Sequence, residues 1–146
     1  MKIKFITSYK PGCWDQYAKK GIEAMAKNLP DEIDLVVYAE EKIPACAYER
    51  IKWIDLNNAE PELFKFKTRH KNDPVANGKL GNVEGGVRRL PELQKLGGLD
   101  KNKESFLWDA VRFANKVFCV INAVRNSLDY NYVVWLDADT NIFRPM

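Results

Sequence analysis

The sequence predicts an α/β protein with an open, mostly parallel sheet flanked by helices. A short β-favouring run at residues 3–7, an apolar, β-branched run at 33–38 and an alternating run at 50–56 are typical of strands. Between the first two runs, apolar residues recur every three or four positions over residues 14–29, which predicts an amphipathic helix that ends before Pro30. A strand, a helix and a second strand at this spacing favour a parallel βαβ unit.

Length and composition indicate one globular domain. The chain has 146 residues, 46% of them hydrophobic and 29% charged, which is enough to bury a core without disulfides. Its net charge of 23 − 20 = +3 is too mild to indicate a nucleic-acid partner. Three widely spaced cysteines without a CxxC pair indicate reduced thiols and a cytoplasmic protein. No apolar run approaches the ~18 residues of a membrane span, and the N-terminus resembles neither a secretory signal nor an anchor.

The second half of the chain is predicted to add one long helix and one strand. The helix signal covers residues 104–126, with a wide apolar face expected to pack on the sheet. That face consists of Phe106, Ala110, Phe113, Val117, Val120, Ile121 and Val124. Residues 132–136 are entirely apolar, so we expect a strand that is buried on both faces at the centre of the sheet. This strand leads directly into Asp137-Ala138-Asp139.

Residues 65–103 differ from the rest in composition. They contain six of the eight glycines and ten Lys or Arg against four Asp or Glu, a local balance of 10 − 4 = +6. We expect a long, basic, partly mobile excursion with short helical turns near residues 87–96. It is either a solvated surface segment or a binding segment for an acidic partner. Its GKLGNVEGG run lacks the Gly-Lys-Ser/Thr ending of a phosphate-binding P-loop.

Asp137 and Asp139 are the strongest candidates for chemistry. In open α/β sheets, ligands bind just beyond the carboxyl ends of the strands. Two carboxylates separated by one residue can converge there on Mg²⁺ or Mn²⁺, which prefer oxygen ligands and take others from a substrate's phosphates. The alternative interpretation is that both residues only turn the chain where the strand ends.

The run YNYVVWLDADTNIFRP resembles the Asp-x-Asp region of GT-A-type glycosyltransferases, which use nucleotide-diphosphate sugars. In those enzymes a buried strand of a Rossmann-like sheet delivers the Asp-x-Asp motif to the metal and the donor. The resemblance implies that Asp137 and Asp139 bind Mn²⁺ or Mg²⁺, and that Asp137 also contacts the donor. It implies transfer of a sugar from a UDP- or GDP-sugar to an acceptor that the sequence does not identify.

The long helix adds to this resemblance. Asp109, Arg112 and Lys116 are spaced i, i+3 and i+7, so a helix would place them on one face. Several GT-A families use an Asp/Arg/Lys set on this helix to contact the ribose or diphosphate of the donor. The resemblance therefore implies donor contacts for these three residues. A solvated helix face with an ordinary ion pair is the alternative.

The N-terminal strand also fits the resemblance. Thr7, Ser8 and Tyr9 stand where such enzymes begin their base- and ribose-binding loop. Glu40, after the second strand, is a further candidate for a ribose contact, whereas His70 is expected to be a surface residue. GT-A enzymes continue beyond the motif into a half that builds the acceptor site. We therefore expect residues 1–146 to be a donor-binding half whose uncovered apolar surface favours self-association.

Two other functions remain open at this point. A haloacid dehalogenase-type phosphatase also places Asp-x-Asp after a strand, but it wants Thr or Val where this chain has Asn141, and its motif opens the chain. A non-catalytic interaction module would use the basic segment 65–103, with Asp137 and Asp139 in structural roles. Salt-sensitive binding to polyanions that needs neither metal nor nucleotide would favour the interaction module.

Overall fold

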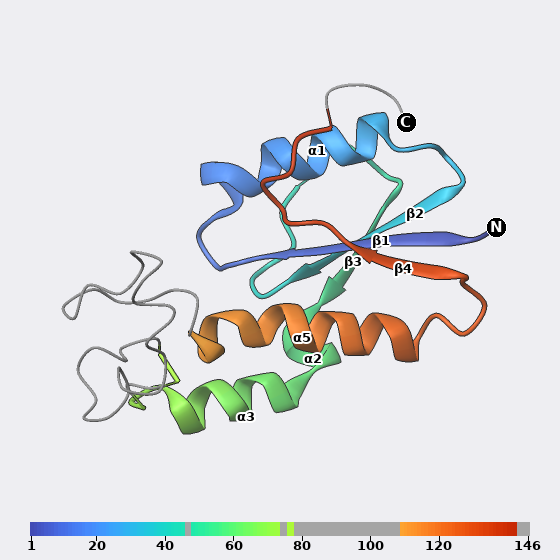
Figure 1. The fold of residues 1–146 in the computed structure, drawn as a ribbon. Helices are drawn as coiled ribbons and strands as arrows, with labels where there is room; N and C mark the ends of the chain where they lie inside the picture. Colours follow the sequence, from blue (N-terminus) through green and yellow to red (C-terminus); the bar gives the residue numbers. More distant parts are fainter. Residues whose placement is uncertain (46–47, 74–75, 78–108, 143–146) are drawn as a thin grey trace, which may run out of the picture. The chain divides into compact units, whose positions relative to one another are not determined.

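The computed structural model describes residues 1–45, 48–73, 76–77 and 109–142 (Figure 1). The chain divides into two compact units, which are described separately below. The first comprises Met1–Pro61 and Lys116–Met146, and the second comprises Glu62–Asn115. The predicted helical turns near residues 87–96, and most of the basic segment 65–103, lie outside the described residues.

The first unit contains a four-stranded, fully parallel sheet with the order β3-β2-β1-β4. The strands are β1 (Ile3–Tyr9), β2 (Ile33–Ala39), β3 (Ile51–Asp55) and β4 (Tyr132–Trp135). The predictions of an α/β class, of a parallel sheet and of four strands at these places are therefore confirmed. The apolar and β-branched residues of these runs suit a pleated surface that packs on both faces.

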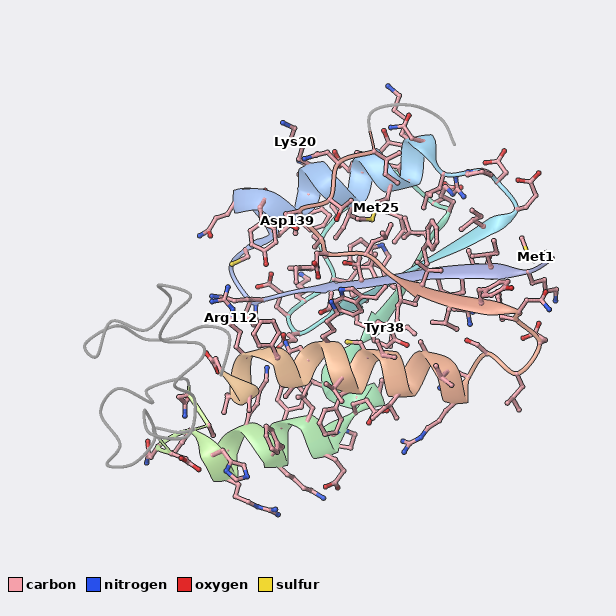
Figure 2. The ribbon with its side chains drawn as sticks, viewed as in Figure 1. Met1, Lys20, Met25, Tyr38, Arg112 and Asp139 are labelled. Atoms are coloured by element: carbon pink, nitrogen blue, oxygen red, sulfur yellow. The ribbon has the colours of Figure 1, made fainter. Side chains whose placement is uncertain are left out.

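One face of the sheet is covered by the chain that follows β1. The predicted helix over residues 14–29 is present, as a π-helical turn η1 (Trp14–Ala18) that continues into α1 (Lys19–Asn28). Ile22 and Met25 of α1 are fully buried against this face of the sheet (Figure 2). Inward-facing strand residues complete this core: Phe5, Tyr9, Leu35, Val37, Ala39 and Ile51.

The opposite face is covered by α5 (Ala110–Arg125), whose residues from Lys116 onward belong to the first unit (Figure 1). Tyr38 of β2 is fully buried on this side, and its hydroxyl donates to Asn122 Oδ1 at 2.9 Å. Asn122 Nδ2 donates in turn to Glu60 Oε1 at 2.9 Å. Burial raises the pKa of Tyr38, so its hydroxyl stays protonated and remains a donor in this chain of contacts.

Two predictions about this side of the sheet were wrong. β4 is not central, because it lies at one edge of the described sheet and its residues are exposed or only half-buried. The apolar face of α5 is not a core face, since Val117, Ile121 and Val124 are 53%, 38% and 54% exposed. The small residues Cys119 and Ala123 are buried instead, because small side chains let a helix lie close to a sheet that already carries large ones.

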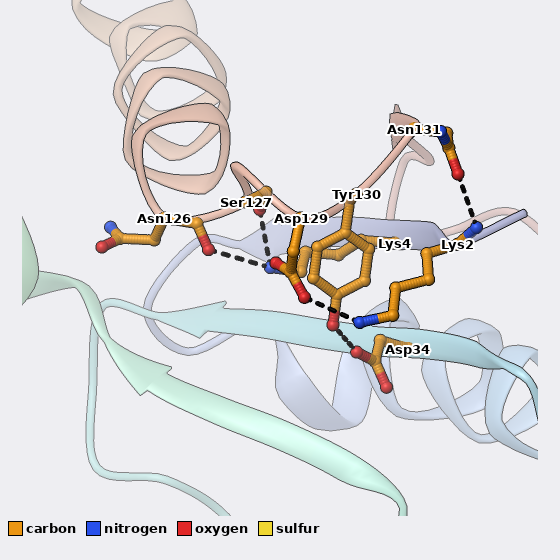
Figure 3. A network of polar contacts seen from close by, with 8 residues as sticks. All are labelled: Lys2, Lys4, Asp34, Asn126, Ser127, Asp129, Tyr130 and Asn131. Atoms are coloured by element: carbon orange, nitrogen blue, oxygen red, sulfur yellow. Dashed lines mark hydrogen bonds and ion pairs between the residues drawn. The ribbon is translucent and has the colours of Figure 1, made fainter.

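A polar network at the amino ends of the strands holds the loop between α5 and β4 (Figure 3). Lys4, only 7% exposed, donates from Nζ to Ser127 Oγ at 2.6 Å and lies over the Tyr130 ring. Burial lowers the pKa of Lys4, and the charge of Lys52 adds to this effect. The Asn131 backbone N–H donates to the Lys2 carbonyl at 2.9 Å, next to the pair of Ile3 with Tyr132. This network thus fixes the register of β4 on β1.

Arg50 fastens the C-terminus of α1 to the start of β2. Its guanidinium donates to four backbone carbonyls at 2.7 to 3.1 Å: Ala26, Leu29, Pro30 and Ile33. These carbonyls include ones that a helix end leaves without an intrahelical partner. The Arg50 side chain therefore supplies the hydrogen-bond donors for the backbone carbonyls of the turn between α1 and β2.

Two short helices follow β3. Asp55 begins α2 (Leu56–Ala59) as an N-cap, accepting from the backbone N–H groups of Asn57 and Asn58. The second helix, α3 (Pro61–His70), lies almost wholly in the second unit. The prediction of an irregular excursion starting at residue 65 was wrong for residues 65–70, which are helical. No helix among the described residues is long and apolar enough to cross a membrane.

Candidate functional site

The carboxyl ends of β1 and β4 lie side by side at the point where the topology of the sheet reverses direction. From β1 the chain passes through α1 to β2 on one side, whereas β4 lies on the other side of β1 and follows α5 on the opposite face. The Leu136 N–H donates to the Ile6 carbonyl at 3.0 Å, which extends the pairing of the strands. Such a switch point is where open α/β sheets bind ligands. Asp137 and Asp139 emerge at this position.

Asp137 is held by two neighbours from different elements. Trp135 Nε1 donates to Asp137 Oδ1 at 2.6 Å, and Lys116 Nζ of α5 lies 3.6 Å from the same oxygen. The Lys116 ammonium also lies 5.1 Å from the centre of the Trp135 ring. Two of the predicted site residues, Lys116 and Asp137, are therefore brought together. Both remain partly exposed, so a ligand can reach them.

Asp139 has a different environment. Its residue is exposed, and no described residue donates a hydrogen bond to its carboxylate. The Thr140 N–H donates to the Asp137 carbonyl at 2.9 Å, which makes a turn with Asp139 inside it. Burial is the main reason for the raised pKa of Tyr17, and the Asp139 carboxylate is among the charges that raise it further. The Asp139 side chain therefore lies near η1 with its oxygens available to a ligand.

Asp137 and Asp139 offer at most a partial set of ligands for a divalent ion. The described residues contain no group of three or more His, Cys, Asp or Glu side chains placed to hold a metal. Asp137 and Asp139 would supply one or two hard carboxylate oxygens. Mg²⁺ commonly binds through one or two carboxylates, with waters and substrate phosphates completing its octahedron. A nucleotide diphosphate is a substrate of that kind.

The end of β1 presents few exposed polar groups. Thr7 and Tyr9 are 0% and 2% exposed, and Ser8 between them is half-buried on the other face. Thr7 Oγ1 and the Tyr9 hydroxyl have no hydrogen-bond partner among the described residues. Burial, with a smaller contribution from the Glu41 charge, raises the pKa of Tyr9 to about 12. All three predicted residues therefore lie at the carboxyl end of β1, and Ser8 is the most accessible of them.

Aromatic rings that the sequence did not single out border this edge. Trp14 of η1 lies 5.5 Å from Tyr9 and 5.7 Å from Trp53 of β3, measured between ring centres. The turn before η1 uses Gly12 at φ +74°, and its N–H donates to Glu41 Oε2 at 2.9 Å. π-helical turns often occur at functional sites.

Asp109 and Arg112 belong to the second unit. The prediction that Asp109 projects from the helix face was wrong, because it precedes the first residue of α5 and serves as its cap. Asp109 Oδ1 accepts from the Arg112 backbone N–H at 2.7 Å. The Arg112 side chain is exposed, near the start of α5 (Figure 2). Glu40, half-buried after β2, accepts at its backbone carbonyl from Asn57 Nδ2 at 3.0 Å.

Comparisons of this chain with protein-family models, with curated proteins and with solved structures find no match. The case for a function therefore depends on the geometry of the residues themselves.

Proposed function

We propose that this chain binds a nucleotide-diphosphate sugar together with Mn²⁺ or Mg²⁺, as the donor-binding part of a GT-A-type glycosyltransferase. One observation carries the proposal: Asp137 and Asp139 emerge from β4 beside the end of β1, at the switch point of a parallel sheet. The proposal includes a UDP- or GDP-sugar as donor and a cytoplasmic location. The parallel α/β architecture supports it and is shared by many other enzymes.

The two carboxylates have separate tasks in this proposal. Asp139, whose oxygens accept no hydrogen bond from the described residues, would be the principal metal ligand. Asp137 Oδ1 already accepts from Trp135 and faces Lys116, so Asp137 would assist the metal through its other oxygen or accept from a ribose hydroxyl. When bound, the metal would neutralise the charge of the leaving nucleoside diphosphate.

Lys116 would contribute positive charge beside the diphosphate. Its ammonium is held over Trp135 and near Asp137, so it is positioned before a ligand arrives. Arg112 belongs to the second unit, so its contact with the donor stays a prediction from the resemblance alone. Ser8, the most accessible residue at the end of β1, would border the base and ribose, with the buried Thr7 and Tyr9 on either side of it in the strand.

Calorimetric titration of the purified chain with UDP and with GDP, each with and without Mn²⁺, tests this proposal. We expect one of the two nucleotides to bind, and to bind only when Mn²⁺ is present, because the diphosphate and the carboxylates repel each other without a cation. Uridine and guanosine serve as controls, since they lack the diphosphate and should gain nothing from Mn²⁺. If both nucleotides fail to bind to the folded chain, or bind equally well without metal, the proposal is wrong.

A further inference from the structure

We infer that α1 positions the two carboxylates of the Asp-x-Asp motif, through Gly21 and Asn28. The expected effect on nucleotide affinity depends on the proposed function. The contacts between α1 and the motif do not, because they involve no ligand. The segment that follows β4 runs along α1 (Figure 1). The motif therefore packs against α1, a contact that the sequence alone did not predict.

Gly21 makes the closest of these contacts. A Cβ added at Gly21 would lie 2.0 Å from the Ala138 carbonyl oxygen and 3.1 Å from the Thr140 carbonyl oxygen. Gly21 lies within the helix, and its φ is not among the positive values. Glycine within a helix costs about 1 kcal/mol relative to alanine. The reason for glycine at this position is therefore the close approach of the 138–140 backbone and not the conformation of its own backbone.

The contact determines where the carboxylates point. Ala138 is only 4% exposed, with its carbonyl against α1, while Asp137 and Asp139 on either side of it are both exposed. Farther along, Asn28 Nδ2 donates to the Ile142 carbonyl at 2.5 Å, so the segment is attached to α1 at a second place. Burying the middle residue of the motif therefore turns its two neighbours outward.

Gly21→Ala tests the inference. Real Cβ atoms essentially never come within 3.0 Å of such neighbours, so the Ala138 carbonyl must move by about 1 Å. A shift of that size can lower the performance of a site about 100-fold. We expect the metal-dependent affinity for UDP or GDP to fall about 10- to 100-fold while far-ultraviolet circular dichroism remains that of a folded chain.

A ligand-free measurement separates this inference from the proposed function. Trp135 Nε1 donates to Asp137 Oδ1, so the indole N–H resonance of Trp135 in a ¹H–¹⁵N spectrum reports the position of Asp137. We expect this resonance to shift in Gly21→Ala. The matched control is Ala26→Gly, which also changes one methyl group in the buried face of α1, five positions along the helix from Gly21. It should lower stability and leave the Trp135 resonance and the metal-dependent affinity unchanged.

Asn28→Ala keeps the test decisive if Gly21→Ala does not fold. It removes the second attachment at the partly exposed end of α1, so the fold should persist and the Trp135 resonance should shift to a smaller extent. An unchanged Trp135 resonance in folded Gly21→Ala, or in Asn28→Ala when Gly21→Ala is unfolded, overturns the inference. A wild-type chain that binds no nucleotide would overturn the proposed function but leave the resonance test valid.

Discussion

Replacing Asp139 by Asn is expected to abolish metal-dependent nucleotide binding and to leave the fold intact. The amide has the shape of the carboxylate but no charge, and it is a poor ligand for a hard divalent cation. Loss of an outer-shell partner of a metal costs about 10- to 100-fold in affinity, so loss of a ligand should cost about 100-fold or more. Because the Asp139 carboxylate accepts no hydrogen bond from the described residues, stability should change by less than about 0.5 kcal/mol.

The matched control for this variant is Asp129→Asn. Asp129 is also an exposed aspartate in the first unit, but it precedes β4 and pairs with Lys2 at the other end of the sheet. Lys2 holds the pKa of the Asp129 carboxyl below its usual range, so this carboxylate is charged at neutral pH. Titration with UDP or GDP and Mn²⁺ should give wild-type affinity for Asp129→Asn. Equal affinities for both variants would remove Asp139 from the site.

Replacing Arg50 by Ala is expected to cause a large loss of stability, although Arg50 is only partly buried and lies outside the site. The Arg50 side chain is 23% exposed, and its four hydrogen bonds reach carbonyls at the end of α1 and in the turn into β2. Hydrogen bonds from a charged group each contribute about 1.5–3 kcal/mol, and a buried acceptor left without a partner costs more. Since water can reach part of this turn, we expect a loss of about 3 kcal/mol, measured by urea unfolding.

Two further variants identify the cause. Arg50→Lys keeps the charge but cannot form the same fork of donors, so its stability should fall between those of Arg50→Ala and the wild type. Asp31→Asn removes only the ion pair of Arg50 with a fully exposed carboxylate, at 3.5 Å, and such pairs contribute little. A loss in Asp31→Asn as large as that in Arg50→Ala would show that the ion pair, and not the carbonyl contacts, stabilises this turn.

The strands could be predicted from sequence, but their order in the sheet could not. Each strand is a short run rich in β-favouring residues and bounded by polar or turn residues. Such a run is too short for most helices, so a strand is the favoured structure. The run at 132–136 suggested a central strand because it has no polar position. The same pattern also suits an edge strand whose two faces are only partly covered, which β4 is among the described strands. The order of the strands depends on which face of the sheet each helix covers, and a local sequence pattern does not predict this.

Helix faces were harder to predict than helix positions. In α5 the hydrophobic pattern predicts that the large residues Val117 and Ile121 are buried, whereas the buried positions are the small residues Cys119 and Ala123. In α3 the run of basic residues hid the helix, because Leu63 is its only fully buried side chain. Hydrophobic periodicity predicts a helix well only when its buried side is also its most hydrophobic side.

The position of the two candidate carboxylates could be predicted from the sequence, but their surroundings could not. The position of Asp137 and Asp139 after an apolar strand is a local pattern. It points to a ligand site because open α/β sheets bind ligands beyond the carboxyl ends of their strands. The pairing of Lys116 with Asp137 joins residues that are 21 positions apart (137 − 116), and the contact of Gly21 with Ala138 joins residues 117 apart (138 − 21). Such contacts arise from the packing of α1 and α5 on opposite faces of the sheet.

The most direct test of the central claim is to locate a bound Mn²⁺ by the broadening it causes in a ¹H–¹⁵N spectrum. The spectrum is recorded with UDP or GDP and less than one equivalent of Mn²⁺. The carboxyl and amino ends of β1 are about 20 Å apart at ~3.3 Å per residue, so paramagnetic broadening distinguishes them. The amide resonances of Ala138, Asp139 and Ser8 should broaden, and those of Asp34 and Asn131 should stay sharp. Broadening centred on Asp34 and Asn131, or none at Ala138 and Asp139, would contradict a metal–nucleotide site at the switch point.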